Sequence, residues 1–197
     1  IRSINIWSLK RKVGFKNKME TYIALLRGIN VSGKNLIKMT DLSIVFTSIG
    51  ISKIKTYKQS GNILFEHSSL DTDLLQKEIE LSIKYQFQLN VPTLIRSKTE
   101  WTKIIEKNPF NDPLKYDENS LHLTFLNQIP SVGQIEKLMV KNVGTDEFKI
   151  LEREIYIHCP NGYGKTKFTN TFFEQQLKMN CTTRNWNTLK ALEEMDF

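Results

Sequence analysis

Polar clusters rich in glycine and asparagine follow four of the predicted strands, and they hold the residues best suited to bind an anion. They read RGINVSGKN at 27–35, QSGN at 59–62, NGYGKT at 161–166 and TTRNWN at 182–187. Glycine permits close backbone approach, while arginine and lysine supply positive charge and N–H donors. Because binding residues concentrate on loops held by a rigid scaffold, we predict the functional site here. The candidate ligand-binding residues are Arg27, Asn30, Lys34, Asn35, Gln59, Ser60, Asn62, Tyr163, Lys165, Arg184, Asn185 and Trp186.

The first and third clusters lead from a strand to a helix, where backbone N–H groups and the helix N-terminus attract anions. Arg27 can fork onto a phosphate or carboxylate, and Lys34 and Lys165 offer point charges. The GKT at 164–166 is similar to the end of a phosphate-binding P-loop. That pattern requires a glycine where Cys159 stands, so a nucleoside triphosphatase is not predicted. The alternative for both clusters is a turn held by asparagines and, at Arg27, an internal salt bridge.

The second and fourth clusters also have structural alternatives. The segment 59–62 is typical of a hairpin turn, and its other role would be to present amide and hydroxyl groups to a ligand. Asn185 or Asn187 is suited to cap the last helix. Trp186 is either a core residue or a stacking platform for a ring.

Catalytic and metal-binding patterns are absent from the sequence. No Ser-His-Asp or Cys-His arrangement and no pair of acid–base carboxylates stands out, so the sequence does not decide whether the protein is an enzyme. The three histidines are scattered without metal-ligand spacing, and we expect neither a metal nor a cofactor. Cys159 and Cys181 do not form a CxxC motif, so we expect reduced thiols in a cytoplasmic protein.

The net charge of +7 is concentrated in the first 18 residues, which hold six basic side chains and no acid. Residues 19–197 carry 22 basic and 21 acidic side chains, so broad binding to duplex DNA is not expected. The first methionine is Met19, and we expect residues 1–18 to be a leader outside the fold. A basic targeting segment and a nucleic-acid or membrane arm are the alternatives. No apolar run approaches the roughly 20 residues that span a bilayer, so we expect no membrane-spanning segment.

Hydrophobic periodicity predicts the order βαββαβ twice. The predicted strands are 22–26, 53–58, 62–66, 91–96, 121–126, 147–151, 155–158 and 181–183. The predicted helices are 40–49, 72–87, 101–105, 132–140, 168–178 and 186–195. Thr40 or Asp41 is the expected cap of the first helix, and Phe168, Phe172 and Leu177 are the expected apolar anchors of the fifth.

This order predicts an α+β fold with two ferredoxin-like halves in tandem, each with an antiparallel or mixed sheet and helices on one face. We expect the first half at 19–96, a connecting segment at 97–119 and the second half at 120–197. The asparagines and prolines at 108–113 favour turns in the connection.

Five ordered motifs resemble those of the bacterial family called domain of unknown function 1697. They are YIALLRGINV at 22–31, TYKQSGNI at 56–63, NPF at 108–110, GYGKTK at 162–167 and TRNWNT at 183–188. The likeness covers about 19–195 and implies two ferredoxin-like halves in one chain. The family's activity is not established, so the resemblance implies no catalytic residue.

Two functional classes remain open at this point. In the first, the protein binds a phosphorylated small molecule, a nucleotide or a nucleic-acid end, and Arg27, Lys165 and Arg184 converge on one shared anion site. In the second, the protein is a non-enzymatic interaction or scaffold module, because no catalytic constellation is found. The sequence does not predict an oligomeric state.

Overall fold

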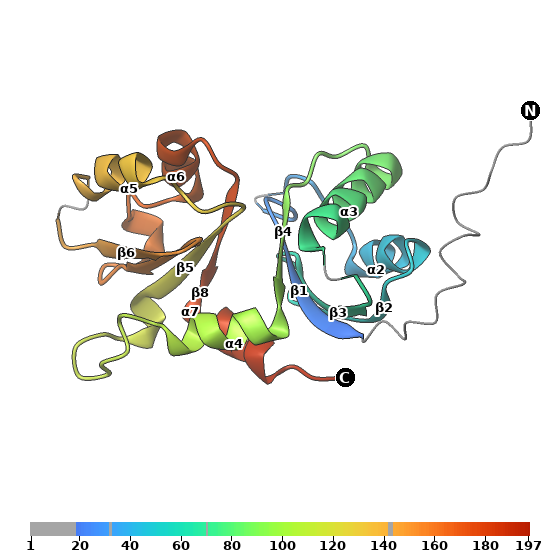
Figure 1. The fold of residues 1–197 in the computed structure, drawn as a ribbon, viewed down its shortest axis with the longest axis horizontal. Helices are drawn as coiled ribbons and strands as arrows, with labels where there is room; N and C mark the ends of the chain where they lie inside the picture. Colours follow the sequence, from blue (N-terminus) through green and yellow to red (C-terminus); the bar gives the residue numbers. More distant parts are fainter. Residues whose placement is uncertain (1–18, 32, 70, 142–143) are drawn as a thin grey trace, which may run out of the picture.

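The computed structural model describes residues 19–31, 33–69, 71–141 and 144–197, and it shows two halves side by side (Figure 1). The expected leader at 1–18 lies outside the described residues. The first half consists of β1 (Glu20–Leu26), α2 (Met39–Ser48), β2 (Ser52–Tyr57), β3 (Asn62–His67), α3 (Thr72–Phe87), β4 (Thr93–Ser97) and α4 (Lys98–Glu106). The second consists of η2 (Glu118–Ser120), β5 (Leu121–Leu126), α5 (Val132–Met139), β6 (Glu147–Leu151), β7 (Glu154–His158), η3 (Tyr163–Lys165), α6 (Asn170–Leu177), β8 (Cys181–Asn185) and α7 (Trp186–Glu194).

Each half contains one four-stranded antiparallel sheet. The strand orders are β2-β3-β1-β4 and β6-β7-β5-β8. Both halves thus have βαββαβ connectivity, which confirms the predicted α+β fold with two tandem ferredoxin-like halves. A further helix follows the last strand of each half, α4 after β4 and α7 after β8. None of the helices in the described ranges is long and apolar enough to cross a membrane.

The pairing register relates the two halves residue by residue. Arg96 in β4 lies opposite Ile23 in β1, and Arg184 in β8 lies opposite Leu123 in β5. Each of these arginines comes directly before the residue that caps the following helix. Arg96 and Arg184 are therefore equivalent positions of an internal repeat, which allows one half to serve as a control for the other.

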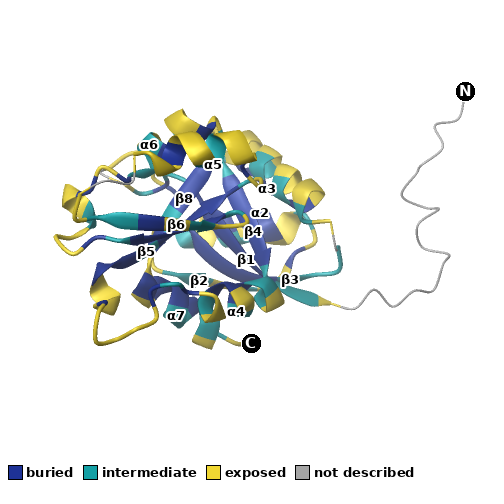
Figure 2. Ribbon diagram, turned by 60° about the vertical axis from the view of Figure 1, so that its left-hand side comes forward, coloured by how far each residue is buried: buried dark blue, intermediate teal, exposed yellow. Residues whose placement is uncertain are grey.

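Three hydrophobic cores hold these layers together. One face of the first sheet packs against α2 and α3, and one face of the second sheet packs against α5 and α6. The remaining faces of both sheets share a central core with α4 and α7, which lie side by side below the sheets in Figure 1. Figure 2 shows the buried strands enclosed by helices whose outer surfaces are exposed. Burial of both sheet faces explains the apolar runs in the central strands.

Two local predictions about the helices were wrong. The N-cap of α2 is Lys38 rather than Thr40 or Asp41, because the side chain of Asn30 binds both backbone groups of Ile37 and sets an earlier helix entry. The predicted anchor Phe172 of α6 is only partly buried. Phe173 and Leu177, four residues apart, form the buried stripe, because Thr169 caps the helix and the helix begins at Asn170.

Three boundaries differ from the predicted ones for identifiable reasons. β4 begins at Thr93 rather than at 91, since Pro92 cannot donate a hydrogen bond to a strand partner. α4 begins at Lys98 because Ser97 and Glu100 form a capping box. β8 continues to Asn185, two residues beyond the predicted end, and this extension places Arg184 within the sheet.

Replacing Asp71 with Ala is expected to reduce the free energy of unfolding by about 1 kcal/mol. The Asp71 carboxylate accepts hydrogen bonds from the backbone N–H groups of Asp73 and Leu74 at 3.1 and 3.0 Å, and so caps α3. Urea denaturation followed by circular dichroism would measure the loss. Asp71→Asn retains a capping side chain and should lose only a few tenths of a kcal/mol. Equal losses in both variants would contradict the capping role.

Candidate functional site

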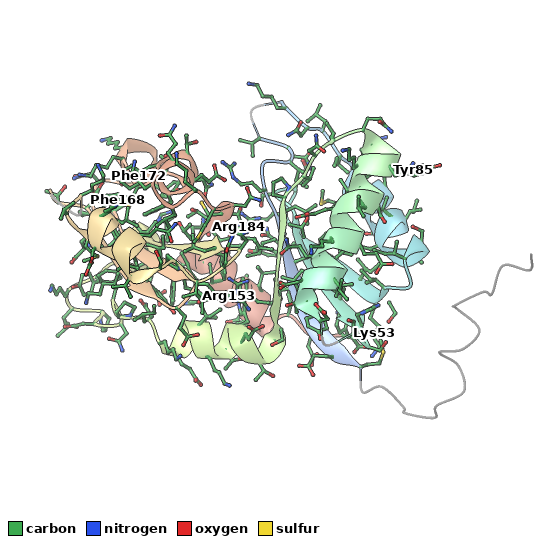
Figure 3. All side chains as sticks on the ribbon, turned by 45° about the horizontal axis from the view of Figure 1, so that its top comes forward. Lys53, Tyr85, Arg153, Phe168, Phe172 and Arg184 are labelled. Atoms are coloured by element: carbon green, nitrogen blue, oxygen red, sulfur yellow. The ribbon has the colours of Figure 1, made fainter. Side chains whose placement is uncertain are left out.

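A cavity of about 340 Å³ lies where the two halves meet. It is formed by the end of β1 with the loop after it, the β2–β3 turn, the first residue of α6, the edge strand β8 and the first turn of α7. In Figure 3 Arg184 lies at this junction between the halves. The residues that line the cavity are Leu26, Arg27, Gly28, Ile29, Val31, Lys58, Ser60, Asn170, Thr182, Thr183, Arg184, Asn185 and Thr188.

Arg184 crosses from the second half into the first, and its side chain is buried. Its Nε donates to Oδ1 of Asn62, and its Nη2 donates to the carbonyl oxygens of Leu26 at 3.0 Å and Gly61 at 3.4 Å. Its Nη1 donates to Oγ1 of Thr182 at 2.7 Å and to the Thr183 carbonyl oxygen at 2.9 Å, and Nη2 also approaches the Ser60 carbonyl oxygen at 3.2 Å. Burial, and secondarily the charge of Arg27, lowers the pKa of Arg184 to about 10. Arg184 therefore holds the halves together and remains a buried cation.

Arg184 has no carboxylate partner among the described residues, whereas its repeat equivalent Arg96 has one. Arg96 donates to Oε1 of Glu154 at 2.9 Å and to the Leu126 carbonyl oxygen at 2.8 Å. Both arginines thus reach across the junction to the end of the other half's central strand. In one case the buried charge is neutralised internally, and in the other it is not.

Three equivalent positions change charge between the halves in the same direction. Asn62 opens β3 where Glu154 opens β7, since each pairs with the last residue of the preceding strand. Lys58 follows β2 where Glu152 follows β6, with φ of 54° and 55°. At the ends of β1 and β5, Arg27 corresponds to Asn127. One neighbouring position differs in the opposite direction, since Gly61 corresponds to Arg153. The four positions together still make the region around Arg184 more positive than the region around Arg96.

Arg27 contributes a partly exposed guanidinium beside the buried one. Its Nε and Nη2 donate to the two carboxylate oxygens of Glu174 at 3.1 and 3.2 Å, and its side chain is 28% exposed. Within the described part of the chain Nη1 makes no hydrogen bond to protein. Arg27 is thus oriented by Glu174 while one edge of its guanidinium is available.

Two helix N-termini also border the cavity. Asn170 is the first residue of α6, while Asn185 caps α7 and accepts a hydrogen bond from the Thr188 N–H at 2.9 Å. The N-terminal end of a helix carries partial positive charge, which favours anions. These ends act in the same direction as the cations of Arg27 and Arg184.

The cavity has more available donors than acceptors. Oxygens of Asn62, Thr182 and Asn185 accept from other protein groups, and Asn170 Oδ1 accepts from the Thr183 hydroxyl at 2.7 Å. In the described ranges no protein acceptor is found for the side-chain NH₂ groups of Asn170 and Asn185 or for the hydroxyl hydrogen of Ser60. A ligand with many acceptor oxygens, such as an oxyanion, complements such a lining.

Of the twelve residues predicted to bind a ligand, the structure brings Arg27, Ser60, Arg184 and Asn185 to this cavity. The others have structural contacts or lie elsewhere. Asn30 and Asn35 stabilise the loop after β1 through the carbonyl oxygens of Ile37, Gln59 and Gly28. Asn62 binds Arg184, and Trp186 belongs to the central core. Lys34, Gln59, Tyr163 and Lys165 do not line the cavity.

The predicted convergence of three cations is therefore corrected. Lys165 is exposed on η3, away from the lining of the cavity, and Lys58 is the lysine that borders it. Tyr163, the first residue of η3, stacks on His122 with ring centroids 4.5 Å apart. The glycine-lysine pattern around Lys165 pointed to that residue, whereas Lys58 precedes the QSGN cluster by one residue and was named only as part of the TYKQSGNI motif at 56–63.

Sequence reasoning also missed Asn170, Thr182, Thr183 and Thr188. Thr182 and Thr183 lie on opposite faces of β8, and Thr188 lies in the first turn of α7. They come close to the end of β1 only because the two halves pack together. The TRNWNT motif at 183–188 was the available signal for this wall of the cavity. No comparable signal exists for Asn170, which is one of many polar residues in a helical segment.

The described residues offer little for nucleophilic or metal chemistry. No group of three His, Cys, Asp or Glu side chains in the described ranges could hold a metal ion. Cys159 and Cys181 are free and buried, and burial raises the pKa of their thiols to about 11 and about 12. Neutral thiols are poor nucleophiles and poor metal ligands. The arrangement is suited to binding an anion.

Comparison with known proteins gives the family and supports the fold. The family model described as "Protein of unknown function (DUF1697)" matches residues 19–156. The structure of the conserved bacterial protein SP0830 from Streptococcus pneumoniae is similar, with a TM-score of 0.70 and 22% identity over 90% of this chain and 98% of that chain. At this identity the likeness shows the fold alone. No curated protein matches the chain.

Proposed function

We propose that this chain, which belongs to the DUF1697 family of proteins of unknown function, binds a phosphate-bearing small molecule in the cavity at the junction of its halves. The observation that carries this proposal is the buried guanidinium of Arg184, which lacks an internal carboxylate where its equivalent Arg96 has Glu154. A buried charge without a counterion is costly. An anion in the adjoining cavity would supply that counterion.

Several features support an anion rather than a neutral ligand. Arg27 and Lys58 add positive charge, and the N-termini of α6 and α7 border the same space. The available protein groups are donors, which suit phosphate oxygens. Glu174 is engaged by Arg27, and the lining itself contains no carboxylate or histidine that could act as an acid or base. We therefore propose binding, and we assign no reaction.

The proposed ligand is a phosphorylated metabolite or nucleotide rather than a nucleic-acid duplex. Basic and acidic residues nearly balance outside the first 18, so this part of the chain has no bulk excess of positive charge to favour duplex binding. The free thiols of Cys159 and Cys181 support a reducing compartment, and we propose the cytoplasm as the place of action.

Lys58→Gln is expected to weaken binding of inorganic phosphate by roughly tenfold, the scale of one charge-assisted hydrogen bond. Lys58 is exposed in the β2–β3 turn, so the fold should be unaffected. Thermal-shift titration with phosphate would measure the affinity, because a ligand that binds only the folded state raises the melting temperature.

Lys165→Gln is the matched control, since Lys165 is also exposed but does not line the cavity. It should bind phosphate like the unmodified protein. If phosphate causes no shift at millimolar concentration in the unmodified protein, the binding proposal is wrong and the scaffold alternative takes precedence. If both variants lose affinity equally, phosphate binds through general charge rather than in the cavity.

A further inference from the structure

We infer that the phosphate is carried by a hydroxyl-rich aliphatic skeleton, such as a sugar or polyol, and that no nucleobase is bound in the cavity. This inference rests on the proposed function and narrows its ligand class. It follows from three features of the cavity: its size, the chemistry of its walls and the absence of aromatic side chains from its lining.

The cavity is too large for inorganic phosphate alone. Its volume of about 340 Å³ is roughly ten times the ~30 Å³ that one water molecule occupies in the liquid. It falls in the range of roughly 300–1,000 Å³ that is usual for small-molecule sites. A ligand that fills it must extend beyond the anionic group.

The walls beyond the cations are neutral and polar. Ser60 and Thr188 bring hydroxyl groups to the lining, while Asn170 and Asn185 bring carboxamides; the Thr183 hydroxyl is engaged by Thr124 and Asn170. The NH₂ groups of both asparagines have no acceptor within the described part of the protein. Hydroxyl groups on a ligand accept from such donors and can donate in return, whereas aliphatic or aromatic skeletons would leave them unsatisfied.

The free edge of β8 adds a backbone donor to this wall. β8 is the last strand of its sheet, and the Cys181 N–H points away from β5, since it approaches Oε1 of Glu174 at 3.5 Å. Backbone groups alternate direction along an antiparallel strand. The N–H of Thr183, two residues further, therefore also points away from β5, on the edge that lines the cavity.

The lining contains no phenylalanine, tyrosine, tryptophan or histidine. Of the aromatic residues close to the lining along the chain, Tyr57 and Phe172 are partly buried and pack against two of the hydrophobic cores. Trp186 is 4% exposed within the central core, and Tyr163 stacks on His122. Sequence-tolerant recognition of a base generally uses an accessible aromatic face. The apolar part of the lining is aliphatic, with Leu26, Ile29 and Val31, and suits the C–H face of a sugar.

Calorimetric titration of the full chain with four probes tests this inference. The probes are inorganic phosphate, ribose 5-phosphate, adenosine 5′-monophosphate and ribose. Ribose 5-phosphate is expected to bind at least tenfold more tightly than phosphate, and the nucleotide is expected to bind no more tightly than ribose 5-phosphate. Ribose alone should bind at least 100-fold more weakly than its phosphate. Asn170→Ala should reduce ribose 5-phosphate affinity about tenfold, with folding verified by thermal melting.

The outcomes separate the inference from the proposed function. Binding of the nucleotide more than tenfold above ribose 5-phosphate would overturn the inference, since the base would then be recognised, but would leave the anion site intact. Equal affinity for phosphate and ribose 5-phosphate would also overturn it and indicate a site for the bare oxyanion. Failure of all three phosphate compounds to bind would overturn the proposed function itself.

Discussion

Arg184→Met is expected to reduce the free energy of unfolding by roughly 3–5 kcal/mol, because several buried oxygens at the junction lose the donor that satisfies them. Methionine fills a similar space but donates no hydrogen bond. The Leu26 carbonyl oxygen and Asn62 Oδ1 would each lose a donor while remaining at the junction, whereas the Gly61 carbonyl oxygen would still accept from the Leu26 N–H at 2.8 Å. Each unsatisfied buried group costs about 1–3 kcal/mol. Part of this loss is offset, because the uncompensated charge is removed as well.

Guanidine or urea denaturation, followed by circular dichroism, would measure this loss. Arg184→Lys should be nearly as destabilising, because one ammonium cannot reproduce the planar fork that serves several oxygens. Lys165→Met is the control at an exposed site and should change stability by less than about 0.5 kcal/mol. A loss below about 1 kcal/mol in Arg184→Met would contradict the role of this side chain in joining the halves.

Arg96, the equivalent of Arg184 in the first half, offers a second test of the predicted loss of stability. Arg96→Met removes the equivalent arginine but leaves Glu154 buried without its partner. It should therefore be at least as destabilising as Arg184→Met, since an unpaired buried carboxylate is added to the lost hydrogen bonds. The two variants together measure how much of each loss is due to charge and how much to hydrogen bonding.

The sequence predicted Arg184 as a ligand-binding residue, and the structure shows why its structural role was not foreseen. Its partners Leu26 and Gly61 are 158 and 123 positions away in the chain. Periodicity and capping residues report contacts within a few positions, so they located the strands, the helices and the repeat. Periodicity and capping residues do not show which strands of the two halves meet at the junction.

The other residues of the site also divide into those with local contacts, which the sequence could predict, and those with distant contacts, which it could not. Asn30 and Asn35 act within the loop that contains them, and the alternative of asparagine turns anticipated their contacts. The salt bridge of Arg27 was anticipated as a type of contact, but its partner Glu174 lies 147 positions away on α6. Lys58 and Asn170 line one cavity only because the two halves pack together, and no local pattern distinguishes Asn170 from other polar residues.

The two halves share a fold, but their sequences differ in charge at equivalent positions around Arg184 and Arg96. An equivalent arginine at both junctions provides the same bridging hydrogen bonds to Leu26 and Leu126. A carboxylate at both junctions would neutralise both arginines and favour neither. Asn62 in place of a glutamate leaves Arg184 without a carboxylate, while its oxygen still accepts from Arg184.

Asn62→Glu is therefore expected to convert the Arg184 junction into one like that of Arg96 and to weaken phosphate binding by roughly 30-fold. The new carboxylate would pair with Arg184, as Glu154 pairs with Arg96. Two like unit charges about 8 Å apart repel by about 2 kcal/mol at an effective dielectric constant of about 20, which gives the expected change. The protein should remain folded, because the ion pair offsets the loss of the Asn62 donors to the Tyr57 carbonyl oxygen and Ser60 Oγ.

Asn62→Gln isolates the charge from the change in side-chain length and should retain most of the phosphate affinity. Glu154→Gln changes the other junction and should destabilise the protein by removing the partner of Arg96, without altering phosphate binding near Arg184. Calorimetric titration with phosphate would compare all three variants. If Asn62→Glu is folded and binds phosphate as tightly as the unmodified protein, the charge of Arg184 is not the source of anion affinity. The buried arginine would then serve only to join the halves, and the interaction-module alternative would account better for the exposed loops.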